Sequence, residues 1–383
     1  MGEDGLRGDV SPTIVILGGT GVFGGRLAKR LARFRDVRLV ITGRDRDRAR
    51  KFAAALRRST GCPSIEGDCL ALGSSLGERL TRIAPDVVVH AAGPFQGQDY
   101  SVPEAVLMAG AHYVDLADGR DFVLGFAAHL DDIARSRGLI AVAGASSVPA
   151  LSSAVVLELA RDLGEVTSIE IGISPGNRAP RGDAVIRAIL SYCGKPIPGW
   201  ANGRRSERIG WQGLRREIIG ELGPRWFCDC DVPDIQLFAQ AYPKARDIRF
   251  GAGLELGFLH LGLWGLSAMV RARMLPPLDR FSGLLRSVAD LLEPFGSDAG
   301  GMFVRVTGKS KEGLPVSHGW QLVAKQGDGP YVPTLPASIM VRKILTGGAG
   351  APGARTSFGT IMLKEFMDEA ADLHIEMGTS DVR

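Results

Sequence analysis

A glycine-rich turn between a buried strand and an amphipathic helix constrains the fold of this chain more than any other feature. Residues 13–17 (TIVIL) are uninterrupted apolar, as in strands that are buried on both faces of a sheet. The turn GGTGVFG at 18–24 follows, and residues 22–33 have the pattern of a helix. Backbone N–H groups at such a helix start bind phosphate well. The strand, turn and helix together therefore indicate a dinucleotide-binding βαβ unit.

The glycines of this turn have separate tasks. Gly19, Gly21 and Gly24 hold the spacing GxGxxG. One glycine permits the tight turn, another lets a pyrophosphate approach the backbone, and the third lets helix and strand pack closely. The alternative is an ordinary strand-to-helix turn without a ligand. We expect the whole turn to bind the cofactor, through Gly18, Gly19, Thr20, Gly21, Val22, Phe23 and Gly24.

The end of the second expected strand, at residues 37–42, bears on the choice of cofactor. NAD-binding proteins keep an acidic residue about 20 residues after the glycine turn. Here Gly43 and Arg44 stand at that position, and an arginine can make paired hydrogen bonds to a 2′-phosphate. We therefore predict NADP(H). NAD(H) remains possible if Asp45 takes the acidic role, and Arg44 could also belong to a solvated helix start.

Apolar runs alternate with helical patterns through the first 150 residues, which predicts an α/β fold with an N-terminal Rossmann parallel sheet. Strict alternation at 167–174, followed by short strand candidates, indicates an inserted second α+β domain of mostly antiparallel sheet. We predict a dinucleotide-binding domain at 12–150 and a substrate and dimerisation domain at 151–330. C-terminal helices at 331–383, with a flexible loop at 347–353, would close back on the first domain.

Composition narrows the classes of protein that the chain can belong to. The 46 basic residues nearly balance the 42 acidic ones, so the net charge of +4 gives no argument for nucleic-acid binding. The five cysteines form no CxxC pair, so neither a disulfide framework nor a metal site is expected. Reduced thiols and polar first residues favour a cytoplasmic protein.

Four further segments carry a family resemblance. They are DVVVHAAGPF at 86–95, AGAHYVDLAD at 109–118, GASSVPALSS at 144–153 and GDGPYVPTLPA at 327–337. With them the chain resembles the saccharopine dehydrogenase-like oxidoreductase family over most of its length. The resemblance implies a Rossmann NAD(P) domain, an inserted second domain and a nicotinamide that faces the cleft between them. In well-known members, hydride transfer makes or breaks a C–N bond of an amino-acid adduct.

The same resemblance implies positions for several residues. Ala92, Gly93, Pro94 and Phe95 would line the ribose and nicotinamide, and Tyr100 and Asp118 would lie near the cleft. Ser146, Ser147 and Pro149 would lie at the domain junction and contact substrate. The chain departs from saccharopine-forming reductases here, because they carry an Asp-Pro-Gly element where residues 147–150 read SVPA. The resemblance therefore does not extend to the saccharopine reaction itself.

Hydride transfer to a polar double bond usually needs a proton donor. Tyr100 and Asp118 follow strand ends, where ligands bind in such sheets, and they are the candidates for catalysis. Tyr100 could equally be a packed aromatic residue. His90 and His112 are better explained as structural, and Asp115 is open between a structural and a catalytic role. In the second domain, Arg178 could bind a substrate carboxylate or lie in a solvated loop.

The apolar run at 251–270 is almost long enough to span a bilayer, but it contains Glu255 and His260. We expect a buried helix, a tunnel wall or a dimer contact there, with peripheral membrane contact as an alternative.

We predict an NADP-dependent oxidoreductase that transfers a hydride between nicotinamide and a C=N, C=O or C=C group of a small molecule, and that forms a homodimer. The alternative is a non-catalytic NAD(P)-binding protein with a regulatory or membrane-surface role.

Overall fold

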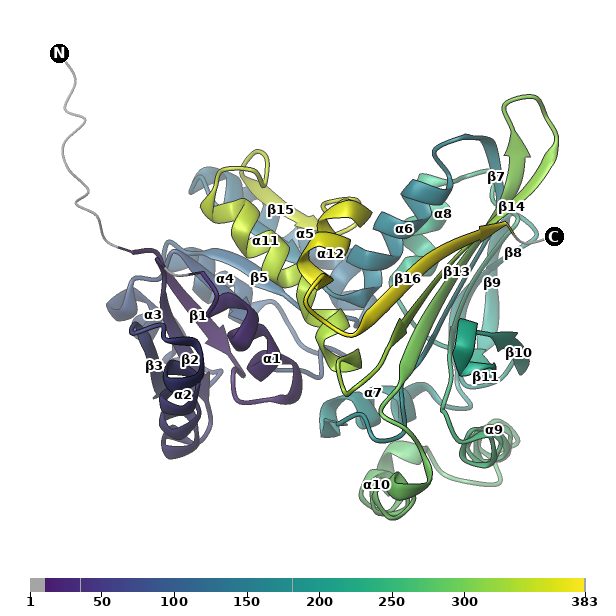
Figure 1. Ribbon diagram of the computed structural model, residues 1–383, viewed down its shortest axis with the longest axis horizontal. Helices are drawn as coiled ribbons and strands as arrows, with labels where there is room; N and C mark the ends of the chain where they lie inside the picture. The colour runs from purple at the N-terminus through teal and green to yellow at the C-terminus, as the bar shows by residue number, and fades with distance from the viewer. Residues whose placement is uncertain (1–10, 35, 181, 382–383) are drawn as a thin grey trace.

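The computed structural model describes residues 11–34, 36–180 and 182–381, and it divides them between two β-sheets (Figure 1). In the first sheet every hydrogen-bonded pair of strands is parallel, in the order β15-β6-β5-β4-β1-β2-β3. The order 3-2-1-4-5-6 within it is that of a Rossmann fold. Its strands are β1 (Thr13–Leu17), β2 (Arg38–Gly43), β3 (Ile65–Cys69), β4 (Val87–His90), β5 (His112–Asp115), β6 (Ile140–Ala143) and β15 (Gly353–Thr356).

Helices cover both faces of this sheet, because its central strands are apolar on both sides. Two successive residues of β1, Ile14 and Val15, belong to two different apolar clusters, one on each face of the sheet. One face packs against α1 (Val22–Leu31), α2 (Arg46–Thr60) and α11 (Leu335–Leu345). The other packs against α3 (Leu76–Ile83), α4 (Ser101–Met108) and α5 (Arg120–Ser136).

The second sheet is mostly antiparallel, in the order β10-β11-β12-β7-β13-β14-β16, with β8 joined to β12 and β9. Among its described strands, only β12 and β7 pair in parallel. The strands are β7 (Leu163–Ser174), β8 (Pro196–Ala201), β9 (Arg204–Ile209), β10 (Arg215–Ile218), β11 (Pro224–Asp229), β12 (Asp247–Ala252), β13 (Gly300–Ser310), β14 (Pro315–Ala324) and β16 (Ile375–Asp381). The predicted fold class is confirmed.

The two sheets share one apolar core. Helices α6 (Ser152–Leu159) and α8 (Asp234–Ala241) cover one face of the second sheet, and Val155 and Phe238 pack there against Ile169 and Val304. The same cluster continues to Ile14 in the first sheet. The remaining elements of the second part are α7 (Asp183–Tyr192), α9 (Gly257–Arg271), α10 (Ser282–Leu291) and the short turns η1 (Ser147–Leu151), η2 (Gly220–Leu222), η3 (Leu278–Phe281), η4 (Glu293–Phe295) and η5 (Gly329–Thr334).

The C-terminal segment differs from its prediction as helices closing on the first domain. After α11, strand β15 extends the first sheet, and after α12 (Leu363–Ala370), strand β16 extends the second. Helix α12 ends at Ala370, and Ile375–Asp381 then pair with His318–Ala324 of β14. The C-terminal segment therefore contributes one strand to each sheet, β15 to the first and β16 to the second.

The apolar run at 251–270 is divided between two elements. Strand β12 ends at Ala252, and α9 begins at Gly257 and has 15 residues. Both ionisable residues of the run have partners: Glu255 accepts hydrogen bonds from Ser297, and His260 Nδ1 accepts one from the Leu254 N–H at 3.2 Å. Within the described ranges, no helix is long and apolar enough to cross a membrane.

Candidate functional site: a dinucleotide site and an interdomain cleft

The glycine turn leaves no room for side chains. Gly18 has φ +76°, and a Cβ on it would lie 2.9 Å from the Cβ of Ala92. A Cβ on Gly24 would lie 2.3 Å from the Gly18 carbonyl oxygen, so this glycine lets the helix pack on the turn. Gly21 caps α1 and is exposed. The first N–H groups of α1 lack intrahelical partners by geometry, and a helix start of this kind can bind phosphate.

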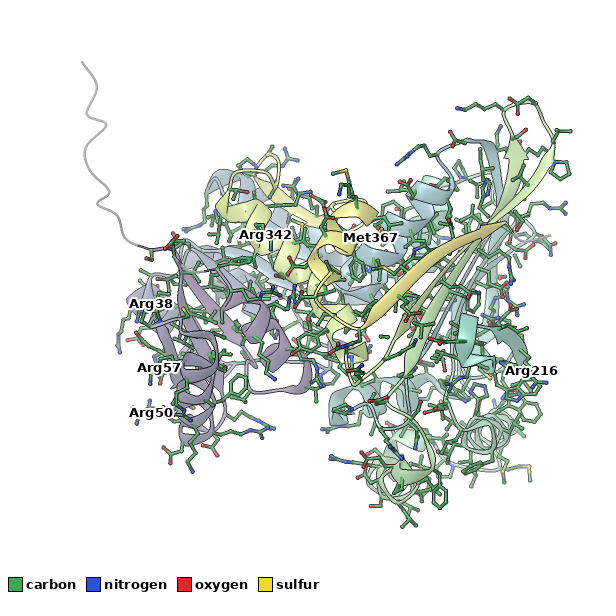
Figure 2. All side chains as sticks on the ribbon, viewed as in Figure 1. Arg38, Arg50, Arg57, Arg216, Arg342 and Met367 are labelled. Atoms are coloured by element: carbon green, nitrogen blue, oxygen red, sulfur yellow. The ribbon has the colours of Figure 1, made fainter. Side chains whose placement is uncertain are left out.

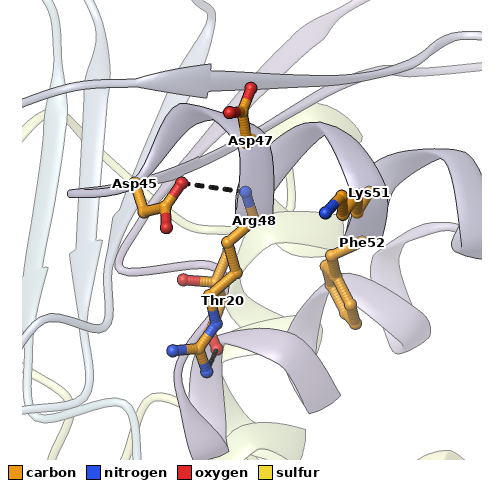
Figure 3. A pocket seen from close by; sticks show the side chains of 6 residues that line it. All are labelled: Thr20, Asp45, Asp47, Arg48, Lys51 and Phe52. Carbon is orange, nitrogen blue, oxygen red and sulfur yellow. Dashed lines mark hydrogen bonds between the residues drawn. The ribbon is translucent and has the colours of Figure 1, made fainter.

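A cavity of about 550 Å³ lies between this turn and the start of α2 (Figure 3). Thr20 lines it from the turn, and Arg48, Lys51 and Phe52 line it from α2. The Arg48 guanidinium donates a hydrogen bond to the Thr20 carbonyl at 3.2 Å, which joins α2 to the turn. A Cβ on Gly43 would lie 2.8 Å from Thr20 Oγ1, so β2 also approaches the turn closely.

The charged residues after β2 have different partners. Asp45 caps α2, and its Oδ1 accepts a hydrogen bond from the Arg48 N–H at 3.0 Å. Arg46 pairs with Asp68 at 3.3 Å. Arg44 and Lys51 are exposed, and within the described residues neither side chain has a hydrogen-bond or ion-pair partner. Arg44 and Lys51 thus lack partners among the described residues, and two carboxylates, Asp45 and Asp47, line the same cavity as Lys51.

The loop after β4 packs against the glycine turn and is fixed by Gln98. Its side-chain amide donates to the carbonyls of Ala92 at 3.1 Å and Pro94 at 2.6 Å. Gly93 is exposed. Phe95 is buried, and its ring lies 5.0 Å from that of His90, so its side chain belongs to the core. The backbone of this loop, rather than the Phe95 side chain, is what a cofactor could contact.

His90 and Asp115 are buried and support the strand ends. Burial lowers the pKa of His90 to about 4, and its Nδ1 lies 3.0 Å from the Tyr113 hydroxyl. Asp115 Oδ1 accepts hydrogen bonds from the N–H groups of Ala117 at 2.9 Å and Gly144 at 2.6 Å. Burial raises the pKa of Asp115 to about 7. His112 Nδ1 accepts from the Ile140 N–H at 2.9 Å, so these three residues hold neighbouring strands together.

Tyr100 lies at the start of α4, and its hydroxyl is 3.0 Å from the Phe122 carbonyl, to which it donates a hydrogen bond. Its ring packs 4.3 Å from the ring of His129 on α5. Burial raises the pKa of Tyr100. These contacts give Tyr100 a structural role, and the geometry does not support the expectation that it donates a proton to substrate.

Asp118 lies where the first sheet meets the second part of the chain. Gln96 Nε2 donates a hydrogen bond to Asp118 Oδ1 at 3.2 Å. In the second part of the chain, the hydroxyl of Tyr192 at the end of α7 lies 2.7 Å from Sγ of Cys230. Burial raises the pKa of Cys230 to about 12, and the charge of Asp118 adds to this shift. Burial also raises the pKa of Asp118, so this carboxyl keeps its proton to a higher pH than an exposed one.

An ion pair connects α5 to the segment between β11 and α8. Arg120 Nε, on the first turn of α5, donates to Asp231 Oδ1 at 2.7 Å. Sequence reasoning missed Gln96, Tyr192 and Cys230, because each is an ordinary residue in a segment without a motif. Their proximity comes from the packing of α7 and the β11–α8 connection against the first sheet.

Three of the predicted substrate residues lie together at one junction, and Arg178 lies elsewhere. Ser146 and Pro149 are buried at the junction between β6 and α6, where Pro149 packs on Gly144, while Ser147 is half-buried. Arg178 is exposed, and its guanidinium donates to the Pro294 carbonyl at 2.9 Å. This contact fixes Arg178 beside η4, so the structure gives it a structural partner in place of a substrate carboxylate.

The strand order, the glycine turn and the cleft define a class of protein: an NAD(P)-binding Rossmann domain joined to a second α+β part. Residues 14–142 match the family model of the saccharopine dehydrogenase NADP binding domain. This part of the chain belongs to that family, and it is an NAD(P)-binding domain.

Solved structures extend the likeness to nearly the whole chain. An apo saccharopine dehydrogenase (L-Glu forming) from Saccharomyces cerevisiae has a TM-score of 0.68 at 14% identity, covering 96% of this chain and 100% of that one. It shares the fold. A meso-dapdh mutant from Clostridium tetani with DAP has a TM-score of only 0.45 at 16% identity, covering 92% of this chain and 95% of that one. This likeness is too weak to indicate a shared fold. No curated protein matches the sequence. The family match covers residues 14–142, and the yeast structure shows that the fold is shared over nearly the whole chain.

Proposed function

We propose that this protein is an NADP-dependent oxidoreductase that acts on a small molecule in the cleft between its two sheets. The observation that carries the proposal is the glycine turn at the end of β1, flanked by the unpartnered cations Arg44 and Lys51. A Cβ on Gly18 or Gly24 would clash with packed protein atoms, whereas Gly21 is exposed at the start of α1 and bears no side chain, so the backbone there fits a close-lying pyrophosphate. Bound NADP(H) would supply or accept the hydride.

Arg44 and Lys51 would determine the preference for NADP(H). A 2′-phosphate adds a negative charge where an NAD-binding protein places a carboxylate, and cations without protein partners are free to bind it. Two acidic side chains, Asp45 and Asp47, also line the cavity, and Asp45 Oδ1 is engaged as the cap of α2. The contact between Arg48 and the Thr20 carbonyl would hold the cavity in shape.

Asp118 would move the proton that accompanies the hydride. Its raised pKa keeps it protonated further toward neutral pH, as a proton donor requires. The hydrogen bond from Gln96 would orient the carboxyl group. Burial raises the pKa values of Tyr192 and Cys230, so neither side chain adds charge near Asp118. Such a cleft suits a C=N, C=O or C=C group better than a highly charged one.

The test is to follow the absorbance of NADPH while the protein is offered imines, ketones and unsaturated acyl compounds in turn. The proposal expects NADPH to be consumed with one class, in proportion to protein concentration. Tight NADPH binding without turnover by any class would contradict the enzymatic proposal, and would favour the non-catalytic regulatory alternative.

A further inference from the structure

A second cavity, of about 560 Å³, lies between helix α8 and the hairpin of strands β8 and β9. A volume of this size is typical of sites that bind small molecules. Figure 1 shows the hairpin at the opposite end of the molecule from α2. The cavity shares no lining residue with the cofactor cavity, and neither Asp118 nor Cys230 lines it. It is therefore separate from the cofactor site and from the surroundings of Asp118.

The floor of this cavity is apolar and fixed in place. Trp200 and Pro198 of β8 line it, together with Ile235 and Ala239 of α8. Trp200, Ile235 and Ala239 belong to one apolar cluster, and the Trp200 indole N–H donates a hydrogen bond to the Ala245 carbonyl at 2.8 Å. A held indole presents a flat face on which another aromatic ring can stack. The floor therefore suits an aromatic group.

Two opposite charges lie at the rim of the cavity. Arg205 and Glu207 of β9 line it, and they pair in register with Trp200 and Pro198 of β8. Residues that pair directly in antiparallel strands point to the same face of the sheet, so both charged side chains project on the side of the apolar floor. They are about 7 Å apart along the strand. Both are exposed, and neither side chain has a hydrogen-bond or ion-pair partner among the described residues.

Two amide side chains complete the rim. Gln236 and Gln240 are four residues apart on α8, so they lie on one face of that helix, and both line the cavity. Within the described ranges neither amide has a hydrogen-bond partner. An amide can donate to a carboxylate and accept from an ammonium group. The cavity thus combines an aromatic floor with a cation, a carboxylate and two amides that are free to bind a ligand.

We propose that this cavity is a second binding site, for a small aromatic zwitterion: a molecule with a carboxylate, an ammonium group and an aromatic ring. The carboxylate pairs with Arg205, the ammonium group pairs with Glu207, and the ring packs on Trp200. A ligand with a single charge leaves one of the two rim charges without a partner, and therefore binds less tightly. The inference does not depend on NADP(H) or on the chemistry at Asp118.

The experiment is calorimetric titration of the full chain with three probes that share a phenyl ring. L-Phenylalanine carries both charges, 3-phenylpropionate carries only the carboxylate, and 2-phenylethylamine carries only the ammonium group. We expect L-phenylalanine to bind about tenfold more tightly than either singly charged probe. Arg205→Gln should weaken the binding of L-phenylalanine and 3-phenylpropionate about tenfold and leave that of 2-phenylethylamine unchanged. Glu207→Gln should weaken L-phenylalanine and 2-phenylethylamine and leave 3-phenylpropionate unchanged.

Two further variants serve as controls. Arg204→Gln is the matched control, because Arg204 precedes Arg205 on β9, is exposed and points to the other face of the hairpin. Arg57→Gln removes an exposed charge on α2, in the other part of the molecule (Figure 2). Both variants should keep the native affinity for L-phenylalanine. All four substituted positions are exposed, so folding should be unaffected, and circular dichroism verifies this.

The absence of L-phenylalanine binding to the native protein at about 10 mM would overturn the proposal. Equal affinities of the native protein for all three probes would also overturn it, and this comparison needs no variant. An affinity for L-phenylalanine that is unchanged in both Arg205→Gln and Glu207→Gln would place its binding outside this cavity, and the proposal would again be wrong. Because the measurement is of binding, its result holds whether or not the protein consumes NADPH.

Discussion

The cofactor end of the first sheet and the interdomain cleft are built on opposite physical principles. At the cofactor end, Arg44 and Lys51 are exposed and without partners, and the glycine turn presents bare backbone. Where the first sheet meets the second part, the half-buried Asp118 and Cys230 have raised pKa values because burial disfavours their charged forms. The first region suits the binding of a charged ligand from solvent, and the second suits groups that stay neutral at working pH. Each region can therefore be disabled separately.

The largest effect is expected from Asp118→Asn. If Asp118 donates the proton, kcat for reduction falls about 10²–10⁴-fold while NADPH affinity changes little. Because burial raises the pKa of Asp118, native activity should be lost as pH rises through that raised value, since only the protonated carboxyl donates. The variant should lack this limb of the pH profile. Asp132→Asn, at an exposed position of α5, is the control, and an equal loss there would remove the special role of Asp118.

The next effect concerns the glycine turn. Gly21→Val places a side chain at the exposed start of α1, so NADPH affinity should fall at least about 100-fold without loss of folding. Gly73→Val is the matched control, because no atom lies within 4 Å of a Cβ at Gly73. Calorimetric titration measures both. Unchanged affinity in Gly21→Val would show that the turn does not bind the cofactor.

Arg44→Ala should weaken the preference for NADPH over NADH. Loss of a charge-assisted pair of hydrogen bonds costs about 1.5–3 kcal/mol, so NADPH affinity should fall roughly 10–100-fold and NADH affinity should hardly change. Arg57→Ala is the control, because Arg57 lies on α2 about 16 Å from the start of that helix, and so away from Arg44. Equal losses for both cofactors would exclude Arg44 from 2′-phosphate recognition.

A smaller effect links the buried carboxyls to stability. Burial raises the pKa of Asp234 from 3.8 to about 7, so the folded protein holds a proton there that the unfolded chain releases. This contribution to stability is fully present below about pH 4 and declines as pH rises toward 7. Between pH 5 and 8, Asp234→Asn should therefore lose less thermal stability than the native protein. A parallel decline in both would show that Asp234 is ionised in the folded state.

The smallest effect belongs to Tyr100. Tyr100→Phe removes a hydrogen bond to the Phe122 carbonyl and should cost about 0.5–1.5 kcal/mol of unfolding free energy. Its kcat should equal that of the native protein, because the hydroxyl is engaged with backbone. A large fall in kcat with unchanged stability would restore Tyr100 as a candidate proton donor.

The two regions also differ in how far the sequence predicts them. The glycine turn and Arg44 follow consecutive strands, so local pattern and the known geometry of parallel sheets are enough to place them. Gln96, Asp118 and Cys230 are separated by more than a hundred residues between first and last, and only packing brings them together. Tyr100 shows the same limit, because its segment could be predicted but the direction of its hydroxyl depends on α5.

The second sheet was harder to predict than the first for a related reason. Strands β8 and β12 do not alternate cleanly between apolar and polar residues. Each contains a glycine whose Cβ position lies against an arginine side chain: Gly199 against Arg208, and Gly251 against Arg215. Strand β16 is short of apolar residues and is specified by its partner β14. Buried parallel strands can be predicted from their uninterrupted apolar composition. The strands of the second sheet form only through pairing with neighbours that are distant in sequence.

Calorimetric titration of the native protein with NADPH and then NADH tests the central claim most directly. The arrangement of the glycine turn, Arg44 and Lys51 predicts binding of both, with NADPH at least about ten times tighter. Equal affinities, or tighter binding of NADH, would contradict the assignment of these cations to a 2′-phosphate, and binding of neither would contradict the dinucleotide site itself.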